Sequence, residues 1–246
     1  MNKIQFIYKK NIVILCVVFS NFFYAQNQES LVFTTFDNII GKQNLAIYNG
    51  AIHINNDRVV KNKHRYFESD NYSSGYIIYN NQQYFDLKLK YDIFEDRLIL
   101  NTEENSNFLG INLIGENISY FSLNNKIFSN SDQFYNFSIA FKKGFYQEIK
   151  FSDQFVLYVK HFKYKREIIN EKSILVDYDL KNEFIIQFKG LFYSVNTKKE
   201  ISKLFLASKD KIYSYFREKK MVEKENKVLF MTDLMKVIYS QEINKI

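Results

Sequence analysis

Four acidic residues in the middle of the chain are of a type that can perform acid–base or metal chemistry: Asp86, Asp92, Glu95 and Asp96. Paired carboxylates serve in general acid–base catalysis, and clustered carboxylates bind Ca²⁺. A calcium loop also needs a glycine-bearing turn and oxygen ligands at fixed spacing, and this stretch has neither. Asp86 and Asp92 alternate with apolar residues, which predicts that both lie on the solvent-exposed face of a strand. We therefore expect surface and turn charges here, with no site.

The three histidines are His53, His64 and His161. No pair has the spacing of a zinc motif, no HExxH occurs, and the single cysteine, Cys16, lies far from all of them. We expect no metal site. His64 begins the run His-Arg-Tyr-Phe, in which a charged and stackable group of side chains suits a binding role.

The motifs of nucleophilic and phosphate-transferring enzymes are missing from the sequence. There is no GxSxG elbow, no Walker A loop and no GxGxxG, and the whole chain has seven glycines. We therefore expect neither catalysis nor a cofactor.

A basic and aromatic run, residues 159–166, offers a different kind of site. Its charges and rings suit an acidic glycan or lipid head groups. Lysines also protect the edges of sheets against aggregation, and we favour this second interpretation. The candidate binding residues are His64, Arg65, Lys160, Lys163, Lys165 and Arg166.

The strand pattern that must position these groups is clearest in residues 75–100, where apolar and polar residues alternate. Successive side chains of a strand point to opposite faces, so one face of this segment is expected to be buried. The expected core residues are Phe85, Leu87, Leu89 and Tyr91, with Leu98 and Leu100 across a turn.

Short strand patterns recur about every 8–12 residues up to residue 196, which predicts a mainly β antiparallel meander, as a sandwich or an open barrel-like sheet. The chain has no proline, so the turns use residues such as Asn80 with Asn81 and Asn124 with Asn125. Asn49 and Gly50 predict a further hairpin.

The pattern changes to a helical period after residue 196. Thr197 and Glu200 form a capping-box pattern, and apolar residues then recur at helical spacing, with another helix expected to begin near Asn226. We expect two or three short helices in residues 197–246, packed on a β domain of residues 26–196.

The N-terminus resembles a secretory signal peptide. Lys3, Lys9 and Lys10 precede a short apolar run, and Ala25 precedes the expected cleavage point. The run is shorter than the roughly 20 apolar residues of a membrane span. Cleavage would remove three of the 34 basic residues and leave 31 against 27 acidic ones, and a surplus of +4 is a weak argument for nucleic acid. The mature chain would then have no cysteine.

Several short motifs occur in a set order along the chain, at residues 48–50, 64–67, 75–79, 89–96, 144–146, 159–166 and 193–200. This order resembles a family of exported, uncharacterised proteins common in the Bacteroidota. The similarity covers about residues 45–240. The resemblance implies export and a β-rich fold, and it implies no activity.

These observations favour an exported, non-catalytic envelope protein with a binding or structural role, in the periplasm or outside the cell. One alternative is a periplasmic lipid or lipoprotein carrier with an apolar cavity, since a curved sheet closed by helices holds such ligands. A hydrolase that uses Asp or Glu is the other. The expected partners are an envelope protein, a lipid or an acidic glycan; no nucleic acid and no span of the mature chain are expected.

Overall fold

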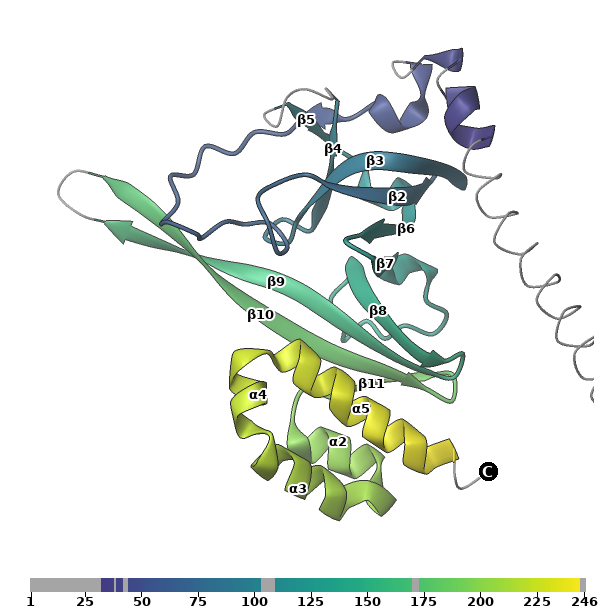
Figure 1. Ribbon diagram of the computed structural model, residues 1–246, viewed down its shortest axis with the longest axis vertical. Coiled ribbons are helices and arrows are strands. Elements are labelled where there is room, and N and C mark those ends of the chain that lie inside the picture. The colour runs from purple at the N-terminus through teal and green to yellow at the C-terminus, as the bar shows by residue number, and fades with distance from the viewer. Residues whose placement is uncertain (1–31, 38, 42–43, 103–108, 170–172, 244–246) are drawn as a thin grey trace, which may run out of the picture.

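The computed structural model describes residues 32–37, 39–41, 44–102, 109–169 and 173–243. The predicted signal peptide, residues 1–25, lies outside the described residues. The described part contains one antiparallel sheet of eleven strands and a C-terminal group of α-helices (Figure 1). The strands are β1 (Ala51–Ile52), β2 (Ser73–Tyr79), β3 (Gln82–Asp92), β4 (Arg97–Asn101), β5 (Gly110–Asn112), β6 (Ile118–Leu123), β7 (Lys126–Asn130), β8 (Phe145–Ser152), β9 (Phe155–Ile169), β10 (Ile174–Phe188) and β11 (Leu191–Ser194). The C-terminal helices are α2 (Lys198–Leu204), α3 (Lys209–Glu218), α4 (Lys220–Glu225) and α5 (Lys227–Ile243).

The strand order is β1-β5-β4-β3-β2-β6-β7-β8-β9-β10-β11. The strands therefore form one continuous hydrogen-bonded sheet, and its edge strands β1 and β11 are not paired with each other. The prediction of a mainly β antiparallel fold with C-terminal helices is confirmed. Four α-helices follow the sheet where two or three short ones were expected, and α5 is 17 residues long.

Two asparagine pairs make tight hairpin turns, as predicted. Asn80 and Asn81 join β2 to β3, and Asn124 and Asn125 join β6 to β7; all four have positive φ. Asparagine tolerates this conformation, which two-residue hairpin turns require.

The hairpin predicted at Asn49 and Gly50 is wrong. The residues before it form a 3-10 helix, Ala46–Tyr48, and β1 pairs with β5. Gly50 allows the main chain just before β1 to lie close to β5, because a Cβ on Gly50 would collide with the main-chain oxygen of Asn112.

A β-bulge interrupts β3 at Asp86, which has a φ of 54°. Gly75 of β2 pairs with Leu87, but Ile77 pairs with Tyr84, so β3 holds one extra residue between these pairs. A bulge of this kind reverses the faces of all residues beyond it.

The bulge decides which predicted core residues are buried. Four of them lie buried in one cluster, as predicted: Leu89, Tyr91, Leu98 and Leu100. Leu87 packs against this cluster while partly exposed. Beyond the bulge, Tyr84 takes the core position and Phe85 stacks on Tyr76 outside it. The prediction for Phe85 is therefore wrong.

The opposite face of β3 is only partly exposed. Asp86 is exposed, as predicted, but Lys90 and Asp92 are buried. The segment before β2 covers them: Arg65 Nε lies 2.6 Å from Asp92 Oδ2, and Lys90 Nζ lies 4.6 Å from the ring centre of Tyr66. The prediction that Asp92 is solvent-exposed is wrong, because an irregular segment folds back over the strand.

The C-terminal helices pack on β8–β10, and Figure 1 shows them gathered beside this part of the sheet. The capping box at Thr197 and Glu200 begins α2, as predicted. The helices bury Phe205, Phe230 and Leu234, among others, against the face of β9 and β10 that carries Leu157 and Phe184. The β9–β10 hairpin continues well past the helices (Figure 1).

Candidate functional site

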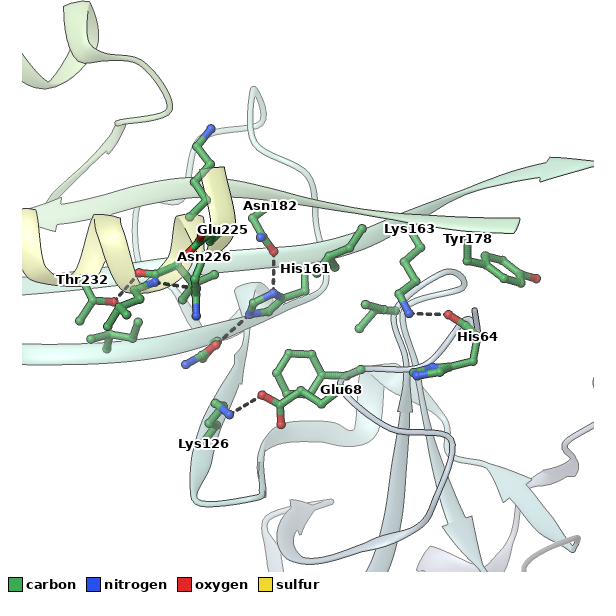
Figure 2. A pocket seen from close by; sticks show the side chains of 18 of the residues that line it. His64, Glu68, Lys126, His161, Lys163, Tyr178, Asn182, Glu225, Asn226 and Thr232 are labelled. Carbon is green, nitrogen blue, oxygen red and sulfur yellow. Dashed lines mark hydrogen bonds and ion pairs between the residues drawn. The ribbon is translucent and has the colours of Figure 1, made fainter. Parts of the chain in front are cut away.

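A cavity of about 780 Å³ lies where the β9–β10 hairpin emerges from beneath the helices (Figure 2). Its floor is formed by β8, β9 and β10. One wall is formed by residues 63–68, and another by the end of α4 and the beginning of α5. Small-molecule sites commonly have volumes of about 300–1,000 Å³, so this cavity has the size of a ligand site.

The floor changes from apolar to polar along β9. Leu157 and Val159 lie beneath the helices, and His161 and Lys163 follow them on the same face of the strand, because alternate residues of a strand share a face. The apolar core beneath the helices therefore continues directly into the polar floor of the cavity.

A row of three polar side chains crosses this floor. His161 Nδ1 lies 2.7 Å from Asn182 Oδ1, and its Nε2 lies 2.8 Å from Gln147 Oε1. Burial lowers the pKa of His161 to about 4, so the ring is neutral at neutral pH. A neutral imidazole has one donor and one acceptor nitrogen, so one of the two amides presents its NH₂ group to the ring. The centre of the floor is thus polar and uncharged.

Lys163 extends from β9 into the cavity (Figure 2). Its Nζ donates hydrogen bonds to the main-chain oxygens of His64 and Tyr66, the latter at 2.9 Å. It forms no ion pair with the described residues. Burial, together with the nearby charge of Lys63, lowers the pKa of Lys163 to about 8, so the ammonium group is mostly charged at neutral pH.

Three further lysines line the cavity, and two of them are paired. Lys126 Nζ lies 2.5 Å from Glu68 Oε1, and Lys63 Nζ lies 3.4 Å from Asp177 Oδ1. Lys227 forms no ion pair with the part of the chain that the structure describes. Lysines outnumber glutamates in the lining by four to two.

Apolar side chains complete the lining. Ile149 and Val228 lie at the helix end, and Phe67 packs on the ring of His161 at 4.8 Å between centroids. Leu180 is 52% exposed and Leu229 is 48% exposed, so apolar surface in the lining is not covered by protein. The cavity therefore offers both charged and apolar contacts to a ligand.

The structure separates the six predicted binding residues. His64 and Lys163 line the cavity. The other four are not part of its lining and form ion pairs: Arg65, Lys160, Lys165 and Arg166.

Strand alternation explains why the basic run does not form one surface. Lys160 and Arg166 lie on the opposite face of β9 from Lys163, and Lys165 pairs with Asp57 at 2.8 Å. Val159 is the last residue of β9 that pairs with β8, so the basic stretch borders a strand edge that β8 leaves open.

Three of the four predicted acidic residues are also paired with cations. Arg65 contacts both Asp92 and Glu95 at 2.6 Å, and Asp96 Oδ2 lies 2.5 Å from Lys160 Nζ. None of the four predicted acidic residues lines the cavity. Among the described residues, no three His, Cys, Asp or Glu side chains come together as a metal site requires.

Most residues of the cavity were missed by sequence reasoning. Lys63, Lys126, Gln147 and Lys227 come from separate segments, and nothing in their local sequence marks them. One signal was available: a buried strand face that turns polar at His161 is unusual, because buried polar groups require partners.

The buried His161 predicts a specific dependence of stability on pH. Its pKa is lower in the folded chain than in the unfolded chain, so the unfolded state takes up a proton first as the pH falls. We expect the free energy of unfolding to decrease between about pH 6.5 and 4, with about 3 kcal/mol due to this residue. Urea unfolding of the wild type and of His161→Gln across this range measures it. An equally steep decrease in the variant would contradict the assignment.

No protein-family model, curated protein or solved structure matches this chain. Within the described residues, no helix is both long and apolar enough to cross a membrane.

Proposed function

We propose that this chain is an exported, non-catalytic binding protein of the cell envelope that holds a small ligand in the cavity beside β9 and β10. The observation that carries this proposal is the cavity, whose floor is a row of hydrogen-bonded polar side chains and whose walls keep apolar surface uncovered. Ligand sites combine apolar surface with placed polar groups, and this lining offers both, with polar side chains in the majority.

Export is the part of the proposal that rests on sequence alone. The charged and apolar N-terminal pattern supports it, with cleavage after Ala25. N-terminal sequencing of the protein recovered outside the inner membrane tests it. A chain that begins at Gln26 supports export, and an uncleaved chain in the inner membrane contradicts it.

Binding can be tested with N-phenyl-1-naphthylamine, an uncharged dye that fluoresces in apolar sites. We expect saturable binding at one site of the wild type. Leu229→Trp should weaken binding by about 10-fold or more, because the larger ring would occupy the apolar part of the cavity in which the dye is expected to lie.

Leu206→Trp is the matched control, since Leu206 is an exposed leucine outside the cavity lining. It should bind the dye like the wild type. No saturable binding by the wild type, or equal binding by Leu229→Trp, would contradict the proposed function.

A further inference from the structure

We propose that the ligand is an anionic amphiphile, with its acidic group at Lys163 and its hydrocarbon part along Ile149, Val228 and Leu229. This inference rests on the proposed function, because it specifies the ligand of the same cavity.

The position of Lys163 supports the acidic group. Its ammonium is partly removed from water and is held by two neutral carbonyl oxygens, with no ion-pair partner among the described residues. An ammonium has three N–H donors, and these two contacts use two of them. A ligand carboxylate or phosphate would supply the missing countercharge, and charge-assisted hydrogen bonds are stronger than neutral ones.

The acidic side chains of the lining do not oppose this placement. Glu68 is paired with Lys126, and Glu225 lies near the start of α5, away from Lys163 (Figure 2). The region between the two ends is occupied by the neutral row that contains His161. An anion at Lys163 therefore meets two lysines, Lys163 and Lys63, at this end of the cavity, and Lys227 lies at the other end.

The other end of the cavity offers apolar side chains to a hydrocarbon chain or ring, beside the polar Glu225 and Lys227. Ile149 and Val228 pack against the core beneath the helices, and Leu229 is half-exposed beside them. Covering such apolar surface is favourable. One molecule with an acidic group and an apolar body would satisfy both ends.

Two related dyes separate charge from apolar binding. 8-Anilinonaphthalene-1-sulfonate has the same phenylnaphthylamine body as the uncharged dye and adds a sulfonate. We expect the wild type to bind the sulfonate dye about 10-fold more tightly. Raising sodium chloride from about 20 to about 500 mM should weaken binding of the sulfonate dye and leave binding of the uncharged dye unchanged.

Variants assign the preference to Lys163. Lys163→Met should remove the preference for the sulfonate dye, and Lys163→Arg should keep it. Lys181→Met is the matched control, since Lys181 lies on the opposite face of β10 beside the same cavity floor, and it should behave like the wild type.

Competition distinguishes the sources of the acidic group. Dodecanoate and dodecyl phosphate should displace the sulfonate dye, and whichever acts at lower concentration identifies a carboxylate or a phosphate ligand. If inorganic phosphate displaced the sulfonate dye at the same concentration as these two compounds, the proposal that the ligand is an amphiphile would be overturned. Equal affinity for both dyes, a preference that survives Lys163→Met, or a sulfonate affinity insensitive to salt would overturn the role of Lys163. Failure of the wild type to bind either dye would instead reject the proposed function.

Discussion

Replacing Arg65 with methionine is expected to lower the free energy of unfolding by about 3–5 kcal/mol. Arg65 Nε lies 2.6 Å from Asp92 Oδ2, and its Nη2 lies 2.6 Å from Glu95 Oε1, although these contacts lack good hydrogen-bond directions. Asp92 is fully buried, and burial already raises its pKa. Without the guanidinium group, the buried Asp92 carboxylate would lose this ion-pair partner. Urea unfolding monitored by circular dichroism measures the change.

Two further variants make this expectation specific. Arg97 also pairs with Glu95, at 3.2 Å, but is exposed, so Arg97→Met should cost less than about 1 kcal/mol. Arg65→Met combined with Asp92→Asn should recover much of the loss, because asparagine keeps an acceptor for the amides of Phe94 and Glu95 without the charge. A double variant no more stable than Arg65→Met alone would contradict this explanation.

Replacing Gly144 with alanine is expected to destabilise the protein by a similar amount, about 3–5 kcal/mol. Gly144 has a φ of 116°, which strains any other residue. Its added Cβ would also collide with Asp96 Oδ2 and lie 2.6 Å from Lys160 Nζ. These two groups form an ion pair at 2.5 Å that joins the β3–β4 turn to β9. The hydroxyl of Tyr91 donates a hydrogen bond to the same carboxylate.

Gly115→Ala provides the control for this prediction. A Cβ at Gly115 meets no atom within 4 Å, so the change should alter the free energy of unfolding by less than about 0.5 kcal/mol. Thermal unfolding of both variants measures the difference. A Gly144→Ala protein as stable as Gly115→Ala would show that the Asp96–Lys160 pair tolerates displacement.

The elements predicted correctly are those defined by local sequence. The capping box at Thr197, the asparagine turns and the alternation around Leu89 each depend on residues close in the chain. The bulge at Asp86 has a weaker local signal, because aspartate tolerates positive φ without requiring it. Sequence alternation alone therefore placed Phe85 on the wrong face.

The candidate site was largely beyond sequence reasoning because it is made by tertiary contacts. Lys163 and His64 were predicted as binding residues without a shared site, and only the fold brings them to one cavity. The sequence pattern predicts Asp92 on the surface, but in the folded chain Arg65 covers it. Long-range pairings of this kind leave no periodic pattern in the sequence.

A crystal structure of the complex with 8-anilinonaphthalene-1-sulfonate would locate the ligand site and show how Lys163 takes part in it. We predict the dye in the cavity beside β9 and β10, with its sulfonate within hydrogen-bond distance of Lys163 Nζ and its rings against Val228 and Leu229. A dye bound elsewhere, or bound in the cavity with its sulfonate directed away from Lys163, would contradict the proposed site.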